Sequence, residues 1–206
     1  MKVKICGLRE HHNVIELSAL QPQWMGFIFY KKSSRHFFDT PQIAQLSEIP
    51  QHIKKVGVFV NESPEEICHL NKQFTLDYIQ LHGSETPAFC QHLKQVGLQI
   101  IKAFSIAEET DFESVETYAP YVDYFLFDTK GKHAGGNGIA FDWKLLGNKR
   151  FTRPFLLSGG IGPGDITKLR NFNHPELAGI DINSCFETAP GLKNVEQIKT
   201  FMQELS

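Results

Sequence analysis

The segment KVGVFVNESPEEICHLNKQFTLDYIQL (residues 55–81) contains the pattern that decides the fold. An apolar, β-favouring run at residues 55–60 is followed by Ser63-Pro64 and two glutamates, a combination typical of a helix start. The spacing then predicts a helix over Pro64–Phe74 and a second strand over Tyr78–Leu81. Two strands joined through a helix are expected to lie parallel, with a right-handed crossover.

Short runs of the same kind recur along all 206 residues, and with the two above they number eight: Val3–Cys6, Met25–Tyr30, Gln99–Phe104, Tyr124–Phe127, Pro154–Leu157 and Ile180–Ile182. Most are separated by polar segments with helical spacing, although those after Phe104 and Phe127 are less clear. Eight such units predict an α/β protein, a single-domain (β/α)8 TIM barrel over residues 1–206, near the lower size limit of that fold. A doubly wound open sheet is the main alternative.

Composition narrows the classes of function. The formal net charge is −2 without long blocks of one sign, which argues against a nucleic-acid binder. No apolar stretch is long enough to span a membrane, and the chain starts with a strand-like run instead of a signal segment. The four cysteines form no CxxC pair and the nine histidines are scattered, so we expect free thiols, no metal site and a cytoplasmic protein.

Polar residues collect where the predicted strands end, which is where barrels carry their active sites. The first strand runs into Cys6 and Gly7, and the sixth runs into Asp128. The eighth contains Asp181 and runs into Asn183 and Ser184. Strand alternation directs Gln80 and His82 inward at the barrel mouth.

The loop SGGIGPGD (residues 158–165) follows the seventh strand. Its glycines, Gly159 and Gly160 first, would let backbone N–H groups approach a phosphate, and barrels often bind phosphate with the loops after strands 7 and 8. The alternative is a flexible turn without a ligand.

Nine short strings, in order from the first strand to the last helix, resemble phosphoribosylanthranilate isomerases: KICG (4–7), GFIF (26–29), SSR (33–35), VGVFVN (56–61), QLHG (80–83), FDT (127–129), GGNGIAFDW (135–143), LSGGI (157–161) and APGLKN (189–194). The resemblance implies a (β/α)8 barrel with a small phosphosugar substrate, no metal and no organic cofactor. It implies the Amadori rearrangement of N-(5′-phosphoribosyl)anthranilate to 1-(o-carboxyphenylamino)-1-deoxyribulose 5-phosphate in tryptophan biosynthesis.

The resemblance also implies residue roles. Cys6 would be the general base and Asp128 the general acid, with the pKa of Asp128 raised by a partly apolar site that Phe127 and its neighbours would form. Arg35 would hold the anthranilate carboxylate. Relatives commonly have proline where Ser34 stands, so this loop is expected to be less rigid.

The sequence allows two roles for each of several other polar residues. Lys4 shares the face of Cys6 and would either favour its thiolate or form a buried ion pair, for example with Asp181. His82 and Gln80, and likewise Asp181, Asn183 and Ser184, would contact substrate or orient neighbours. Lys31, Lys32 and His36 are expected to be exposed, and the segment 135–143 would either close over the substrate or form a rigid connection.

The sequence leaves two alternative functions open. One is another phosphosugar barrel, although the histidine-pathway isomerase would need an aspartate where Cys6 stands. The other is a non-catalytic sensor of phosphorylated ligands, against which the presence of both Cys6 and Asp128 argues. The expected partners are a small phosphosugar only, with no nucleic acid and no membrane, and the oligomeric state is open between monomer and homodimer.

Overall fold

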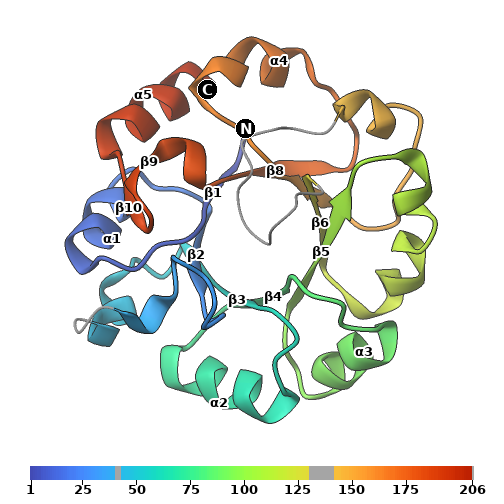
Figure 1. Cartoon of the computed structure of the whole chain (residues 1–206), viewed down its shortest axis with the longest axis horizontal. Helices are drawn as coiled ribbons and strands as arrows, with labels where there is room; N and C mark the ends of the chain where they lie inside the picture. The colour runs from blue at the N-terminus through green and yellow to red at the C-terminus, as the bar shows by residue number, and fades with distance from the viewer. Residues whose placement is uncertain (40–42, 130–141, 206) are drawn as a thin grey trace.

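The structure is a computed structural model that describes residues 1–39, 43–129 and 142–205. Eight parallel strands form a closed barrel in chain order, with helices around the outside (Figure 1). The strands are β1 (Val3–Ile5), β2 (Trp24–Ile28), β3 (Lys54–Phe59), β4 (Tyr78–Leu81), β5 (Ile100–Ile106), β6 (Tyr124–Thr129), β7 (Phe155–Leu157) and β8 (Leu177–Ile182). The predicted TIM barrel is confirmed, and pairing of β1 with β8 excludes the open sheet.

The α-helices are α1 (His11–Ser18), α2 (Pro64–Phe74), α3 (Pro87–Gln95), α4 (Ile166–Asn171) and α5 (Val195–Leu205). Helix α2 has the predicted bounds, and the Ser63 side chain accepts a hydrogen bond from the backbone N–H of Glu66. Thr86 caps α3 in the same way through Phe89. These caps satisfy N–H groups that the first helical turn leaves unpaired, so the Ser-Pro and Thr-Pro signals fix where each helix begins.

Several connections contain 3-10 helices instead of α-helices. They follow β2 (Phe37–Asp39 and Ile43–Glu48), β5 (Glu109–Phe112 and Val115–Tyr121) and β6 (Trp143–Leu146). Pro120 inside one of them has no backbone N–H to donate, which prevents a regular α-helix there. Short 3-10 turns also lie at Pro163–Asp165 and Ser184–Phe186.

A two-stranded antiparallel hairpin follows β8 and was not predicted. It consists of β9 (Glu187–Ala189) and β10 (Leu192–Lys193), and in Figure 1 it lies between α1 and α5, to the outside of β1. Because the two strands are very short, they carry no alternating pattern that periodicity could detect. The hairpin is placed beside the C-terminal end of β8, where site residues are expected.

Two apolar layers support the barrel. The interior is filled by a small cluster of Trp24, Val56, Ile101, Ala103, Leu126 and Leu156. A larger cluster fills the space between strands and helices, and Phe125 and Phe127 belong to it, packed against Phe151 and Phe155. Among the described residues, none of the helices combines the length and apolar character needed to cross a membrane.

Candidate active site

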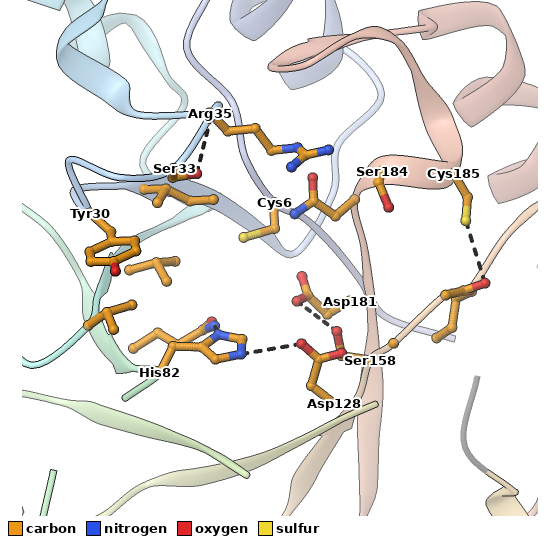
Figure 2. A pocket seen from close by; sticks show the side chains of 18 residues that line it. Cys6, Tyr30, Ser33, Arg35, His82, Asp128, Ser158, Asp181, Ser184 and Cys185 are labelled. Carbon is orange, nitrogen blue, oxygen red and sulfur yellow. Dashed lines mark hydrogen bonds and ion pairs between the residues drawn. The ribbon is translucent and has the colours of Figure 1, made fainter. Parts of the chain in front are cut away.

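A pocket opens at the C-terminal ends of the strands, with a volume of about 770 Å³ that includes its part open to solvent. The site residues expected from the sequence all line it: Cys6, Arg35, Gln80, His82, Asp128, Gly159, Gly160, Asp181, Asn183 and Ser184. Figure 2 shows Cys6 and the Asp128–His82 pair on different sides of the same hollow.

Cys6 lies at the end of β1 and is almost completely buried, with 4% of its surface exposed. Its backbone N–H donates to the carbonyl of Ile182 on β8, at 2.9 Å. The next residue, Gly7, has φ +77°, and a Cβ there would come within 2.8 Å of both Asn183 Oδ1 and Arg35 Cδ. Glycine is therefore required directly after the thiol, because a side chain would collide with two other residues of the pocket.

The ammonium of Lys4 forms a buried ion pair with Asp181, at 2.8 Å, and Ser158 Oγ donates to the other carboxylate oxygen at 3.2 Å. The ion-pair interpretation of Lys4 is thus confirmed. Burial raises the pKa of the Cys6 thiol; the charge of Lys4 lowers that pKa and the charge of Asp181 raises it, and the net direction is upward. The effect of Lys4, which favours the thiolate, is therefore outweighed by burial together with the charge of Asp181.

Gly26 on β2 is a site residue for which sequence reasoning assigned no role. A Cβ at this position would lie 2.8 Å from Cys6 Sγ and 3.2 Å from Lys4 Nζ. Real Cβ atoms do not approach a sulfur that closely, so the space beside Gly26 is what admits the thiol and the ammonium together. Its presence in the string GFIF was the available signal.

Asp128 is the last residue but one of β6, and its carboxylate lies 3.2 Å from His82 Nε2, while its Oδ1 accepts a hydrogen bond from the backbone N–H of Thr129. Gln80 Nε2 lies 3.0 Å from His82 Nδ1, so an amide donating there leaves the imidazole proton on Nε2, directed at Asp128. The prediction of apolar surroundings for the Asp128 carboxylate is wrong. Phe127 points to the outer face of the strand, and the neighbours of the carboxylate are polar.

The glycine loop after β7 needs its glycines for conformation. Gly159 and Gly160 have φ +89° and +69°, and a Cβ on Gly159 would collide with Thr129 and lie 2.9 Å from Asp128 Oδ1. Cys185 contacts this loop through Sγ, 3.5 Å from the Gly160 carbonyl. The backbone can therefore come close to a bound group while lying against the Asp128 end of the pocket.

Arg35 follows β2 and makes a bidentate ion pair with Glu187, with Nε to Oε1 at 2.8 Å and Nη2 to Oε2 at 2.6 Å. The backbone N–H of Arg35 donates a hydrogen bond to Ser33 Oγ at 3.1 Å, and the backbone carbonyl of Ser34 accepts one from Arg9 Nη1 at 3.4 Å. The segment directly before Arg35 is therefore fixed by two hydrogen bonds, although position 34 is a serine and not a proline.

The predicted exposed flank is correct for Lys31 and Lys32 but wrong for His36. His36 is 8% exposed, because residue 36 forms a β-bridge to Ile28 and its ring lies against Phe38.

Glu187, Lys193 and Asn13 were also missed. Lys193 lies in the quoted string APGLKN, which was a usable signal, whereas Glu187 and Asn13 belong to no string and are brought in by the hairpin and α1. Of the segment 135–143, residues 135–141 lie outside the described residues. Trp143 is buried beneath the Lys168 ammonium, 3.6 Å from its ring centre. Within residues 1–39, 43–129 and 142–205, no three His, Cys, Asp or Glu side chains gather as metal ligands.

Comparison with known proteins agrees with this geometry. Residues 3–204 match the family described as N-(5′-phosphoribosyl)anthranilate (PRA) isomerase. The N-(5′-phosphoribosyl)anthranilate isomerase of Parabacteroides distasonis is 47% identical over 206 residues, covering 100% of this chain and 93% of the relative.

Two solved structures are similar over the whole barrel. The phosphoribosyl anthranilate isomerase of Thermotoga maritima superimposes with a TM-score of 0.87 at 32% identity, covering 100% of this chain and 98% of that one. A phosphoribosyl anthranilate isomerase in complex with reduced 1-(o-carboxyphenylamino)-1-deoxyribulose 5-phosphate has a TM-score of 0.84 at 31% identity, with the same coverage. This agreement covers nearly the whole chain and fits the closed barrel and the position of the pocket. The chain therefore belongs to the N-(5′-phosphoribosyl)anthranilate isomerase family of tryptophan biosynthesis.

Proposed function

We propose that this isomerase carries out the Amadori rearrangement of N-(5′-phosphoribosyl)anthranilate with Cys6 as general base and Asp128 as general acid. One observation carries the assignment: the thiol and the carboxyl group, from β1 and β6, line the same pocket. Because β7 and β8 lie between those strands in the closed barrel, the two groups approach a ligand from different sides (Figure 2). Opposed groups are what the reaction requires.

The proton movements follow from that placement. Asp128 protonates the furanose ring oxygen, the C1′–O bond breaks, and the nitrogen lone pair forms an iminium ion. The thiolate of Cys6 then removes the proton at C2′, and the electron pair of that C–H bond gives an enolamine that tautomerises to the ketone. The step leaves Asp128 as carboxylate and Cys6 as thiol, so each group exchanges one proton with solvent before the next turnover.

Cys6 must lose its proton before it can act as a base. Burial and Asp181 hold its pKa above the ordinary value, against the charge of Lys4, so the active thiolate fraction grows as the pH rises. His82 supports the other group, because its ring N–H is directed at Asp128 and Gln80 fixes the other ring nitrogen. We assign both residues to orientation of the acid.

The remaining residues suit the two ends of the substrate. Arg35 would hold the anthranilate carboxylate, while the Gly159–Gly160 backbone and Ser184 would surround the phosphate. Asp181 and Asn183 line the wall between these ends. The solved relative that contains a reduced carboxyphenylamino-deoxyribulose phosphate supports a ligand with this arrangement of groups.

We also propose the cellular compartment, the domain organisation and the oligomeric state of the protein. All four cysteines are free, which agrees with a reducing compartment, and we propose the cytoplasm. We further propose that residues 1–206 fold as one domain and that the protein works as a monomer or a homodimer. Light scattering of the purified chain distinguishes these two states.

The proposed activity is tested by incubating the purified chain with N-(5′-phosphoribosyl)anthranilate and following the carboxyphenylamino product. We expect catalytic turnover without added metal or cofactor. Binding of the substrate without any product would instead support the sensor function.

A further inference from the structure

The β9–β10 hairpin determines how Arg35 is presented. The guanidinium has two edges that can each donate a pair of parallel hydrogen bonds to a carboxylate. Glu187 occupies the edge formed by Nε and Nη2, through bonds of 2.8 Å and 2.6 Å. Both side chains are mostly buried, with 13% and 6% exposed, so the pair is shielded from water. A guanidinium held in this way has a fixed plane and a fixed direction.

Glu187 is itself held by the hairpin. Lys193 Nζ donates to its Oε1 at 2.6 Å, and the Gly191 N–H donates to the same oxygen at 3.1 Å. Burial alone would raise the pKa of Glu187, but the hydrogen bonds from Arg35 and the charge of Lys193 outweigh it and the pKa is lowered. Glu187 is therefore a carboxylate at neutral pH.

Lys193 connects this network to the pocket and to α1. Its ammonium is fully buried and also donates to Asn183 Oδ1 at 2.6 Å. The Asn13 side chain bonds both backbone groups of Lys193, accepting from its N–H at 2.8 Å and donating to its carbonyl at 2.9 Å. The hairpin is thus fixed to α1, and a chain of contacts runs from Asn13 through Lys193 and Glu187 to Arg35.

We propose that Glu187, held by Lys193, is a positioning residue that makes Arg35 selective for a substrate with a carboxyl group on its aromatic ring. Glu187 uses the Nε edge, so the edge formed by Nη1 and Nη2 is the one available to a ligand carboxylate. Arg35 and Glu187 form a neutral pair, and Lys193, whose pKa is lowered by burial, adds a positive charge beside the pair when it is protonated. Figure 2 shows the Arg35 side chain extending toward the side of the pocket where Cys6 and Ser184 lie.

Position, and not charge alone, makes this arrangement selective. Without Glu187 the two cations would attract any anion, including the phosphate end of the ligand, and the guanidinium would lose its fixed plane. With Glu187 in place, the surplus charge is confined to one donor edge. This inference rests on the proposed function, because it assigns the aromatic carboxyl group to Arg35.

The test compares two ligands that differ by one group: reduced 1-(o-carboxyphenylamino)-1-deoxyribulose 5-phosphate and the same molecule without the carboxyl group. Affinities are measured by calorimetry for the native protein and for Glu187→Ala, Glu187→Gln and Arg35→Ala. We expect the ratio of the two affinities to fall about tenfold in both Glu187 variants, with little change for the carboxyl-free ligand. Retained binding of the carboxyl-free ligand also shows that each variant is folded.

Asp123→Asn is the matched control. Asp123 makes a part-buried ion pair with Lys94 just before β6, at the opposite end of the barrel from the pocket, so its loss should leave the ratio unchanged. An unchanged ratio in both Glu187 variants, with loss of discrimination in Arg35→Ala, would overturn the inference and leave the proposed function standing. Equal weakening of both ligands would overturn it as well. If the native protein failed to distinguish the ligands and failed to turn over substrate, the proposed function itself would fall.

Discussion

Lys4 on β1 and Asp181 on β8 face each other on neighbouring strands, with Lys4 Nζ 2.8 Å from Asp181 Oδ1. Lys4 precedes Cys6 by two residues in the sequence. The pair places one charge of each sign near the group that we assign as the base. Lys4 lowers the Cys6 pKa and Asp181 raises it, in addition to the upward effect of burial. Two substitutions should therefore move the activity in opposite directions along the pH axis.

Replacement of Asp181 by Asn removes the negative charge, so the Cys6 pKa should fall and the rising limb of kcat/KM should move to lower pH. Lys4→Met should move the same limb to higher pH, because the cation is lost and a buried carboxylate remains. The measurement is kcat/KM against pH, which reports groups of the free enzyme. A profile that stays in place in Lys4→Met would show that Lys4 has no influence on the base.

Gly26→Ala should displace the thiol, since the new methyl group would lie 2.8 Å from Cys6 Sγ. We expect kcat to fall by about a hundredfold, with ligand affinity much less affected. Gly57→Ala is the control, because its Cβ would meet Leu76 and Phe59 in the outer core. That variant should lose stability but keep kcat at a temperature where it is folded. An equal loss of kcat in both variants would assign the effect of Gly26 to general packing.

His82→Gln should weaken the acid step without removing the ligand site. The substitution deletes the ring N–H that is directed at Asp128 at 3.2 Å. We expect kcat to fall by about tenfold to a hundredfold at nearly constant ligand affinity. A change confined to affinity would instead make His82 a substrate contact, which was the other interpretation from the sequence.

Glu187→Gln should reduce the dependence of stability on acid. Because the pKa of Glu187 is lowered in the folded chain, its ion pairs stabilise the fold fully above the ordinary glutamate pKa. That stabilisation is lost as the pH falls through the lowered value. At neutral pH the variant should be about 3 kcal/mol less stable, and the gap should narrow in acid. Urea unfolding of both proteins at about pH 7 and about pH 3 measures the gap; a constant gap would contradict the ion-pair account.

The barrel and most of the pocket could be predicted because they depend on local signals. Strand alternation placed Gln80 and His82 inward, and the rule that sites lie at strand ends brought Cys6 and Asp128 to one pocket. The side chains that hold those groups were harder to predict. Glu187 contacts Arg35 although the two are 152 residues apart in the sequence, and no pattern in the residues next to Glu187 predicts that contact.

Two errors have physical causes. The phenylalanines near Asp128 are numerous in the sequence, but alternation sends Phe125 and Phe127 to the outer layer, away from the carboxylate. His36 sits among charged loop residues, yet the chain turns back at this point to bridge β2 and buries it. Both errors came from judging side-chain surroundings by sequence proximity alone.

The most direct test of the central claim measures turnover and ligand affinity together in Cys6→Ala and Asp128→Ala. If the thiol and the carboxyl group are the base and the acid, each substitution should lower kcat by about a thousandfold or more. Affinity for reduced 1-(o-carboxyphenylamino)-1-deoxyribulose 5-phosphate should stay within about threefold of the native value. Undiminished turnover in the Cys6→Ala variant would contradict the account.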